Sequence, residues 1–361
     1  MLTFEEKYNA FLRKDSSLEG ILFVAVKTTG IFCRPTCTAR KPNPDNVIFY
    51  NNVKEALQNG YRPCKLCNPL EEPGRMPGYV EEIISELNKY PYRMIKDYGL
   101  RERGINPAQI RRWFKKNHNI TFHSYQRMLR INNAFHKINN GDKVIDTAFD
   151  NGYNSLSGFN DRYQAIFGAP PTKSKDKNVI NITRFTTPLG PMFAAATSKG
   201  ICLLEFTDRR MLETEFKELR KLLSAVILPG TNEHIKQLRK ELAEYFKGNR
   251  RSFSVSLDTP GTDFQKAVWK ELVKIPYGET ASYKEQAIKL NNSNAVRAVG
   301  NANGHNRISI VVPCHRVIGE DGSLTGYGGG LSRKRWLLDF EKKHSVSAKQ
   351  AVFEFDEQLT F

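Results

Sequence analysis

The sequence lacks long hydrophobic runs. No stretch approaches the ~18 to 20 apolar residues that a membrane-spanning helix requires. The first residues, MLTFEEKYNAFLRKDSS, are charged and lack the apolar run and small-residue cleavage site of a secretory signal. Internal repeats and low-complexity tracts are also missing. We therefore expect a soluble, intracellular protein of the cytoplasm.

Acidic residues are scarce relative to basic ones. The chain has 38 Asp and Glu against 55 Lys and Arg, and its pI is near 9.5. This balance favours a polyanionic partner, nucleic acid first and an anionic membrane second, although a merely basic soluble protein would share it. With 361 residues, 40% of them hydrophobic, the chain can build two or three separate cores.

Proline and glycine gather in two segments, NPLEEPGRMPG (68–78) and GAPPTKSKDKN (168–178), which are typical of linkers. Between them the pattern is helical throughout. The part before them suggests strands in GILFVAVKTTG and VIFYNN and a short helix in NVKEALQNG. The last part opens with short strands and is expected to become mostly helical after about Arg209. The predicted domains are 1–72, 79–172 and 179–343, with a tail at 344–361 that carries no usable signal.

Cysteines are few, and four of the six lie close together. Cys33 and Cys37 are separated by three residues, and Cys64 and Cys67, which begin 26 residues later, by two. Two such pairs among turn-forming residues favour a tetrahedral zinc site with four thiolates. Chance clustering or redox-active thiols are the alternatives. The fifth cysteine, Cys202, lies in GICLLEF, a run typical of a buried strand.

Basic residues flank both cysteine pairs. Arg34 and Arg40 accompany the first pair, and Arg62 and Lys65 the second. A purely structural zinc site needs none of them. Zinc keeps a bound sulfur deprotonated at neutral pH. If DNA phosphates approach these residues, a zinc-bound thiolate is therefore poised to attack an alkyl group on a phosphate.

The middle domain shows two helix-turn-helix patterns. In the first, Asn106 is a good N-cap, with Pro107 at the first helical position. The apolar face of this helix is predicted to contain Ile110, Trp113 and Phe114. The side chains left for solvent or DNA are Gln109, Arg111, Arg112, Lys115 and Lys116.

The second pattern repeats the plan. Val144, Ile145 and Ala148 are expected to form one apolar face, and DNGY makes the turn. Asn154 or Ser155 caps the next helix, which carries Phe159, Tyr163 and Phe167 and ends at Gly168. Any small helical bundle could show such pairs. However, the spacing I…A…GY.S.S.F…Y…FG..P resembles the signature of AraC-type DNA-binding domains, whose two helix-turn-helix units would dock in successive major grooves.

The C-terminal part carries an adjacent cysteine and histidine in VVPCHRVIG. Cys314 precedes His315, and Glu341 ends an apolar helical run from which it could orient the imidazole. Glycines at 326, 328, 329 and 330 would let the backbone approach a flat ligand. The alternative is a buried cysteine in a strand with His315 as a satisfied polar neighbour.

The surrounding motifs are more specific than the pair. PCHRVIG, with SYKEQA and VRAVGNANGHN upstream, resembles the O6-alkylguanine-DNA alkyltransferases over roughly 160 residues. The order TTGIFCRPTCTAR…GYRPCKLCNP, AraC-type segment and PCHRV is similar to the Ada family of bacterial adaptive-response proteins. The resemblance implies a multidomain α+β protein. Its parts would be a small α/β zinc domain, an all-α double helix-turn-helix domain and an α+β alkyltransferase module. In that module an RNase H-like subdomain (179–258) precedes a helical, winged-helix-like catalytic subdomain (259–343).

The resemblance also implies roles for residues of the C-terminal site. Cys314 would accept an alkyl group from O6 of guanine, His315 would be the water-mediated base, and Glu341 its partner. Asn306 would bridge two turns of the site. The target base must leave the stack before a sulfur can reach O6, which costs a few kcal/mol.

Three further residues would handle the extruded nucleotide. Tyr283 would help to rotate it, and Arg297 would enter the duplex in its place. Tyr327 and the glycines after it would shape the base pocket. All these motif positions are present in the chain.

In the N-terminal domain the resemblance makes Cys33 a second acceptor, for methyl from a methylphosphotriester, while Cys37, Cys64 and Cys67 remain zinc ligands. Methylation would remove one negative charge near a DNA phosphate, worth roughly 1 kcal/mol in water and up to ~4 kcal/mol near a protein surface. This gain could convert the protein into an activator that binds promoter DNA and works with RNA polymerase. The competing functions are a zinc-containing regulator that only binds DNA and a cysteine hydrolase.

Overall fold

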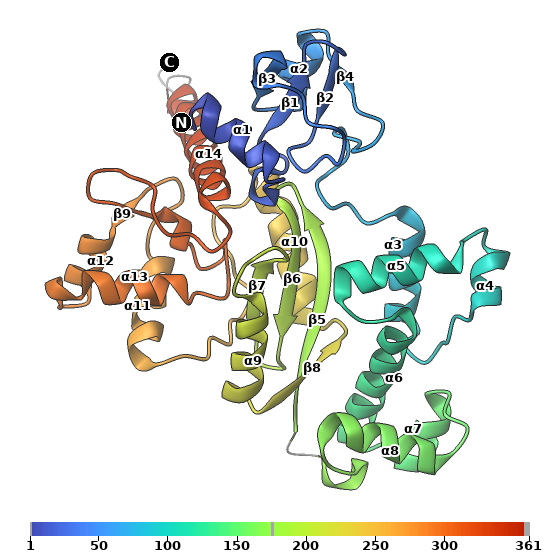
Figure 1. The fold of residues 1–361 in the computed structure, drawn as a ribbon. Helices are drawn as coiled ribbons and strands as arrows, with labels where there is room; N and C mark the ends of the chain where they lie inside the picture. The colour runs from blue at the N-terminus through green and yellow to red at the C-terminus, as the bar shows by residue number, and fades with distance from the viewer. Residues whose placement is uncertain (1, 175–176, 357–361) are drawn as a thin grey trace.

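The computed structural model describes the backbone of residues 2–174 and 177–356, with side chains up to residue 345. Within these residues no helix is long and apolar enough to cross a membrane. Figure 1 shows three parts in chain order: a small sheet domain, a helical domain, and a larger module whose sheet lies below the small sheet domain and beside the helical domain. This is the multidomain α+β organisation that the sequence predicts.

The N-terminal domain is a four-stranded sheet in the order β3-β1-β2-β4. β1 is antiparallel to β2 and β3, whereas β2 and β4 run parallel and pair Phe32 with Pro63. Cys33, the last residue of β2, and Cys64, the residue after β4, therefore lie at the same end of the sheet. The elements are α1 (Phe4–Leu12), η1 (Ser16–Leu18), β1 (Phe23–Val26), β2 (Ile31–Cys33), η2 (Pro44–Asn46), β3 (Val47–Tyr50), α2 (Val53–Gln58) and β4 (Arg62–Pro63).

The middle domain is entirely helical. α6 runs through both halves of it: its first half packs on the core around Ile110 and Phe114, and its second half on the core around Phe159 and Tyr163. The elements are α3 (Gly78–Lys89), α4 (Asp97–Glu102), α5 (Pro107–His118), α6 (Phe122–Asn139), α7 (Val144–Asp150), α8 (Leu156–Phe167) and η3 (Pro171–Lys173).

Residues predicted from the sequence cap α5 and α8, the second helices of the two helix-turn-helix patterns. The side chain of Asn106 accepts a hydrogen bond from the amide of Ala108 at 2.9 Å, as an N-cap does. Ser155, rather than Asn154, caps α8 by accepting from the amide of Gly158 at 3.1 Å. α8 ends where Gly168 takes a left-handed conformation with φ 68°. The predicted caps at Asn106, Ser155 and Gly168 are confirmed.

The apolar face expected for α7 is partly wrong. Ala148 is fully buried, but Ile145 is 48% exposed, and Thr147 takes a buried position beside Ala148. α7 has only seven residues, of which Thr147 and Ala148 are buried. A helix this short leaves the periodicity with too few positions to decide which face turns inward.

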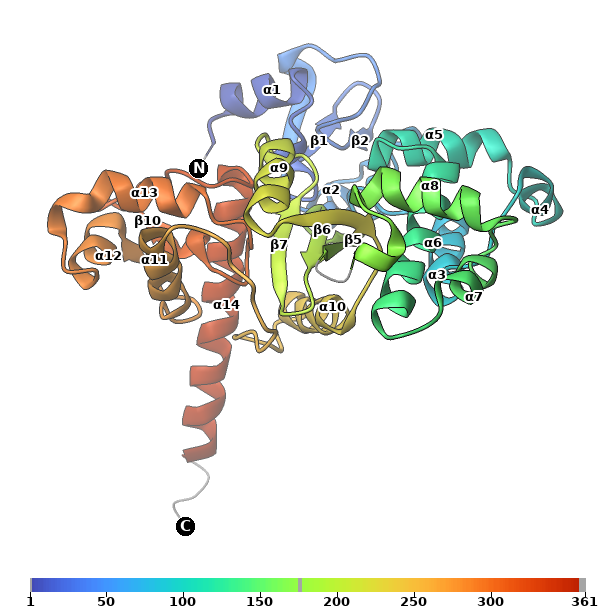
Figure 2. The same ribbon diagram turned by 90° about the horizontal axis from the view of Figure 1, so that it is seen from below.

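The C-terminal module begins with a second sheet in the order β7-β6-β5-β8. Alternate residues of β6 face opposite sides: Ala194 and Ala196 pack with α10, and Ala195 with α9. The two helices accordingly cover opposite faces of the sheet (Figure 2). The elements are β5 (Asn178–Thr187), β6 (Gly190–Ala196), β7 (Ile201–Phe206), α9 (Leu212–Leu222), β8 (Ala225–Pro229) and α10 (Glu233–Phe246).

The strand β8 was not expected, because the segment after Arg209 was predicted to be mostly helical. AVILP is a short apolar run, and periodicity cannot separate such a strand from part of a buried helix. Its place is decided by parallel pairing with β5, from Asn178 with Ala225 to Ile182 with Pro229. That partner lies more than 40 residues away along the chain.

The remaining elements form a helical subdomain that shares its core with the sheet. Val268, Val299 and Leu337 pack in the same cluster as Phe206 and Leu238. Backbone bonds also join the two subdomains, since the amide of Leu204 donates to Arg307 O at 2.8 Å. The elements are α11 (Asp263–Val273), β9 (Ala281–Ser282), α12 (Tyr283–Lys289), η4 (Ser293–Ala295), α13 (Val296–Gly304), η5 (Cys314–Arg316), β10 (Val317–Ile318) and α14 (Leu331–Asp356).

The three parts contact one another through polar bonds. Ser16 Oγ in the N-terminal domain donates to Asp208 Oδ2 at 2.7 Å. Asn132 Nδ2 on α6 donates to Asn181 Oδ1 at 2.7 Å and to Pro229 O at 3.1 Å, which fixes the helical domain against β5 and β8. The C-terminal module therefore anchors both other domains.

Candidate functional site

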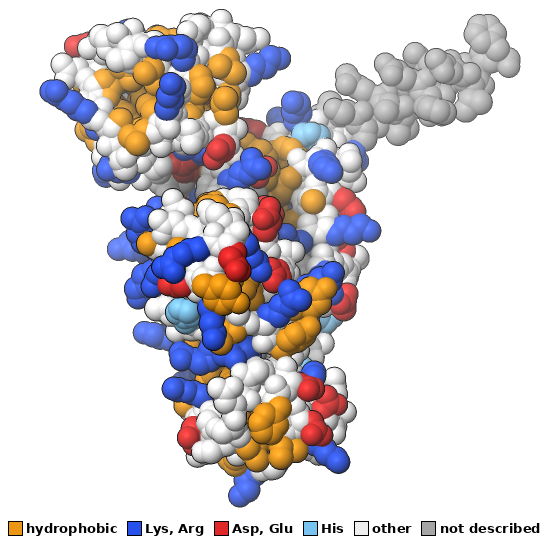
Figure 3. Space-filling view, turned by 90° about the vertical axis from the view of Figure 1, so that its right-hand side faces the viewer, with side chains coloured by type: hydrophobic (Ala, Val, Ile, Leu, Met, Phe, Trp, Pro, Cys, Tyr) orange, Lys and Arg blue, Asp and Glu red, His pale blue; other side chains and the backbone are white. Residues whose placement is uncertain are grey.

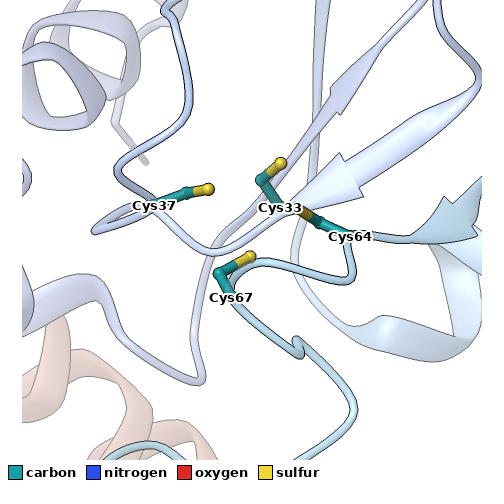
Figure 4. Close-up of side chains that lie close together, drawn as sticks. All are labelled: Cys33, Cys37, Cys64 and Cys67. Carbon is teal, nitrogen blue, oxygen red and sulfur yellow. The ribbon is translucent and has the colours of Figure 1, made fainter.

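The four clustered cysteines meet beside the small sheet. Cys33 ends β2 and Cys64 follows β4, whereas Cys37 and Cys67 come from the loops that continue these strands (Figure 4). Their sulfur atoms all lie within 4.8 Å of one another. Four thiolates at Zn–S distances of about 2.3 Å would place their sulfurs at similar separations. The donor set fits a structural zinc ion, and the predicted zinc site is confirmed.

Arg34 was predicted to contact DNA, but the structure gives its side chain partners within the protein. Its side chain is buried and its Nη1 donates to Glu19 Oε2 at 2.9 Å. The other guanidinium nitrogens donate to the carbonyl oxygens of Cys67, Asn68 and Glu71. A guanidinium occupied in this way holds the second cysteine loop against the first, and four of its five N–H donors are used within the protein. By contrast, Arg40, Arg62 and Lys65 are exposed around the cysteines.

Arg34 is therefore expected to determine the stability of the zinc site. Arg34→Gln removes one partner of a buried ion pair, which typically costs about 3–5 kcal/mol. The variant should unfold its N-terminal domain at lower temperature and release zinc sooner. Zinc release can be followed with a metal-binding dye while the full-length protein is heated.

Arg40→Gln is the matched control, because it removes an exposed positive charge from the same loop. We expect it to leave zinc release unchanged and to weaken binding to DNA. If Arg34→Gln instead behaved like Arg40→Gln, with normal zinc retention and weaker DNA binding, the structural role of Arg34 would be refuted.

The helical domain presents basic side chains on α5. Gln109 and Arg112 are exposed, as are Lys115 and Lys116. Arg111 is half exposed and pairs with Asp97 on α4 at 2.9 Å. Figure 3 views the molecule from the side of this domain and shows Lys and Arg side chains crowded along one edge. Ile110 and Phe114 are buried as predicted, and Trp113 is half-buried beneath Arg184 of β5.

The C-terminal site is centred on Cys314, which begins the short helix η5 and is buried. Asn306 lies in the turn after α13, and its Nδ2 donates to Cys314 Sγ at 3.2 Å and to Val312 O at 2.8 Å. Its Oδ1 accepts from the amide of Ile308 at 3.0 Å. Asn306 therefore ties two turns together and holds the sulfur between them.

His315 and Glu341 form the second half of the site. His315 Nε2 lies 2.9 Å from Glu341 Oε1, and both side chains are fully buried. With its proton on Nε2, shared with the carboxylate, the imidazole keeps a lone pair on Nδ1. That Nδ1 has no hydrogen-bond partner among the described residues. The pair thus offers a base with one nitrogen oriented and the other free.

The charge states follow from burial. Burial raises the pKa of the Cys314 thiol, although the hydrogen bond from Asn306 and the charges of Arg209 and Lys334 oppose this. Burial also lowers the pKa of His315, against the pull of the Glu341 carboxylate. At neutral pH the resting site therefore holds a thiol and a neutral imidazole, so a proton must move before the sulfur can act as a nucleophile.

Glu341 is held by more partners than the sequence suggested. It accepts hydrogen bonds from Tyr245 Oη at 2.7 Å, from the amide of Gly278 at 3.2 Å, and from Arg316 Nε and Nη2 at 2.8 and 3.0 Å. Burial alone would raise the pKa of Glu341, but His315 and Arg316 outweigh it and hold the pKa well below its usual range. Glu341 is thus a carboxylate that can stabilise an imidazolium.

Two tyrosines lie beside this group. The ring centroids of Tyr327 and His315 are 6.3 Å apart, and Tyr283 Oη donates to Thr325 O at 3.2 Å. Both tyrosines are half-buried at the loop that follows β10. Arg297 is exposed on the first turn of α13 and lies outside the hydrogen-bonded group.

Three glycines in the loop between β10 and α14 make room for protein groups, whereas the sequence suggested that they make room for a ligand. A Cβ atom at Gly328 would lie 1.7 Å from Arg209 Nη1, and one at Gly329 2.8 Å from the ring of Phe206. At Gly330, which has a positive φ, it would meet Ser17 of the N-terminal domain at 2.9 Å. The missing side chains at 328, 329 and 330 therefore make room for protein groups behind the loop rather than for a ligand.

Lys334 is a buried charge that the sequence did not single out. Its Nζ donates to the carbonyl oxygens of Val317 and Thr325, at 2.5 and 2.6 Å, which ties α14 to β10 and to the loop that follows it. Burial lowers the pKa of Lys334 to about 8. A lysine next to an arginine in a helical run gives no sign of such burial, because both usually lie at the surface.

Four domain families match consecutive parts of the chain. They are the metal-binding domain of Ada (residues 6–70), a helix-turn-helix domain (100–177), and two domains of 6-O-methylguanine DNA methyltransferase. The latter two are the ribonuclease-like domain (182–259) and the DNA-binding domain (263–343).

Individual relatives agree with these domain matches. The chain is 30% identical to the bifunctional transcriptional activator/DNA repair enzyme Ada of Escherichia coli K12, over 95% of this chain and 98% of that protein. It is 45% identical to the methylated-DNA–protein-cysteine methyltransferase of Mycobacterium tuberculosis H37Rv, over 46% of this chain and 95% of that protein. A crystal structure of Mycobacterium tuberculosis OGT in complex with DNA is 42% identical, with a TM-score of 0.39, and covers 46% of this chain and 94% of that one.

Proposed function

This chain belongs to the Ada family of transcriptional activators and DNA repair enzymes, and from that premise we propose that it repairs alkylated DNA by accepting methyl groups on two of its own cysteines. Cys314 would take methyl from O6-methylguanine, and Cys33 from methylphosphotriesters. One observation best supports this proposal. The buried side chains of Asn306, Cys314, His315 and Glu341 bring together a thiol, a base and a carboxylate that orients the base.

The transfer at Cys314 can be written from these residues. The thiol proton passes to Nδ1 of His315 through one intervening water, and Glu341 stabilises the imidazolium that forms. The sulfur then bonds to the methyl carbon while the carbon–O6 bond breaks, and guanine leaves with the electron pair and takes a proton. The product is an S-methylcysteine. Because a thioether is a poor leaving group, each site would act once.

The roles proposed for residues that would contact DNA are based on where these residues lie in the structure. Arg297, exposed on α13, would enter the duplex where the guanine has left the stack. Tyr283 would rotate the nucleotide, and Tyr327 would line its pocket. Gln109, Arg111 and Arg112 would contact promoter DNA from α5.

At the N-terminal site the zinc ion would keep the cysteine sulfurs deprotonated. Cys33 ends β2 and would bond to the methyl carbon of the triester, whose oxygen leaves as an ordinary phosphodiester. Cys37, Cys64 and Cys67 would remain ligands. Exposed Arg40 would draw the DNA backbone to this edge.

Loss of one negative charge beside the phosphate backbone would strengthen DNA binding and turn the protein into an activator of alkylation-response genes that works with RNA polymerase. Residues 1–72 and 79–172 would supply this regulatory part, and 179–258 with 259–343 the guanine-repair part. A DNA substrate would place the protein in the cytoplasm.

Intact-protein mass spectrometry tests the proposal. Wild-type protein is incubated with duplex DNA that carries O6-methylguanine, methylphosphotriesters, both or neither. We expect one methyl group for each kind of lesion, mapped by peptide analysis to Cys314 and Cys33 respectively. Methyl on neither cysteine would refute the proposal, and methyl on Cys314 alone would leave the zinc domain with a structural role only.

A further inference from the structure

Arg209 is a buried arginine that the mechanism above does not use. It lies in the turn after β7. Its Nη1 donates to Glu205 Oε2 at 2.9 Å, and its Nε lies 2.8 Å from Oε1 of the buried Glu215 on α9. Its Nη2 donates to Gly304 O at 2.9 Å. Glu205, itself completely buried, also accepts from Ser309 Oγ. Arg209 and Glu205 together thus bond to the chain on both sides of Asn306, the residue that holds the Cys314 sulfur.

The same guanidinium supports the opposite wall of the site. A Cβ atom on Gly328 would lie 1.7 Å from Nη1 and 2.5 Å from Cζ of Arg209, so the loop backbone rests directly on the guanidinium. Gly328 follows Tyr327, whose ring stands next to His315. Arg209 therefore contacts both the turn that carries Asn306 and the loop that carries Tyr327.

The neighbouring residue reinforces this arrangement. Asp208 pairs with Arg333 through both guanidinium nitrogens, at 2.8 and 2.9 Å, and Arg333 Nη1 also donates to Gly329 O at 3.1 Å. The turn after β7 thus holds the loop at two successive residues. A buried ion pair contributes little net stability compared with apolar packing, but it can fix geometry.

We propose that Arg209 is a positioning residue for alkyl transfer: it sets the separation of the Asn306 turn and the Tyr327 loop on either side of Cys314. This inference rests on the proposed function at Cys314 and adds a residue from the sheet subdomain to that site. Glycine is then required at 328 because the guanidinium occupies the space of a side chain.

The charge of Arg209 gives a second readout. Arg209 and Lys334 lower the pKa of the Cys314 thiol, whereas burial and Glu205 raise it. The other groups around the sulfur are Asn306, His315, Tyr283 and Tyr327. Removing Arg209 takes away one of the positive charges that lower the pKa of the thiol, so the pKa of Cys314 should rise. Transfer by an Arg209→Ala variant should therefore need a higher pH.

The test is single-turnover transfer of methyl from an O6-methylguanine duplex to Cys314 as a function of DNA concentration. We expect Arg209→Ala to lower the rate at saturating DNA on the order of 100-fold, as a misplacement of about 1 Å can do. The half-saturating DNA concentration should change by less than about threefold, and the pH profile should move upward. Arg209→Lys should recover only part of the rate, because an ammonium cannot reach Glu205, Glu215 and Gly304 O at once.

Gly328→Ala and the double variant Arg209→Ala/Gly328→Ala complete a double-mutant cycle, which measures whether residues 209 and 328 act together. The alanine at 328 should lower the rate when Arg209 is present and add little, less than about threefold, when it is absent. Arg210→Ala is the control, because Arg210 is exposed in the same turn. Thermal unfolding of each variant is measured first, and transfer is then compared at a temperature at which all variants are folded.

The outcomes distinguish a failure of the proposed function from a failure of the inference about Arg209. A wild-type protein that never methylates Cys314 overturns the proposed function, and the inference with it. If wild type is methylated but Arg209→Ala reacts within about twofold of it with an unchanged pH profile, the inference alone fails. It fails also if the effects of Arg209→Ala and Gly328→Ala are fully additive.

Discussion

Cys314→Ser should lose transfer from O6-methylguanine by at least ~10⁴-fold while keeping its fold and its zinc site. A serine hydroxyl is close in size to the thiol and can still accept the hydrogen bond from Asn306 Nδ2. It remains protonated, however, at any pH where His315 could accept its proton, so no nucleophile forms. Loss of a nucleophile has effects of this size in enzymes whose catalytic residues act together. The measurement is single-turnover transfer with methyl-labelled DNA.

Two comparisons make this result specific. The Cys314→Ser variant should still accept one methyl group at Cys33 from phosphotriester DNA, because the two sites lie in different domains. Cys202→Ala, which alters the other buried cysteine of the module, should keep transfer from guanine. Methyl transfer from guanine by Cys314→Ser would mean that another residue is the acceptor.

Glu341→Gln should have the second largest effect, on both rate and stability. The carboxylate accepts hydrogen bonds from five groups, including two from Arg316 and one from His315. An amide of the same shape carries no charge and leaves the Arg316 guanidinium buried without a counterion, which costs about 3–5 kcal/mol. It also cannot stabilise an imidazolium, so we expect a rate about 10²- to 10⁴-fold lower.

A graded set of variants separates the two effects. Tyr245→Phe removes one hydrogen bond to the same carboxylate and should cost about 1.5–3 kcal/mol, with a small change in rate. Glu320→Gln removes an exposed pair with Lys284 and should change neither quantity measurably. Urea unfolding gives the stabilities, and transfer is measured where every variant is folded. A Glu341→Gln protein with wild-type rate would show that His315 needs no carboxylate partner.

Local sequence patterns predicted the parts of the structure that local chemistry decides. Asn106 and Ser155 are caps because a short polar side chain can reach the amides of the next turn, whatever the rest of the chain does. The zinc cysteines were recognisable because the spacing within each pair suffices to bring two sulfurs to one ion. Cys314 and His315 were found because they are adjacent, and because their motif resembles a known family.

Residues whose roles depend on distant partners could not be predicted. Arg34 follows a zinc cysteine, and only its contacts with Glu19 and with the loop at 67–71 show that it is a structural residue. Arg209 meets Gly304 and Gly328 across about 100 residues. An exposed and a buried arginine look alike in a sequence, because the difference lies in which carboxylates and carbonyl groups the fold brings near.

The contact between the N-terminal domain and the loop at 326–330 bears on how such proteins evolve. Ser16 bonds to Asp208, and Ser17 fills the space beside Gly330. The Mycobacterium tuberculosis relative covers only 46% of this chain, so a methyltransferase module also exists as a shorter protein. Splitting the gene of this chain before the module would expose Gly330 and leave Asp208 without its Ser16 donor. A separated module would therefore need other side chains to replace the contacts that Ser16 and Ser17 make.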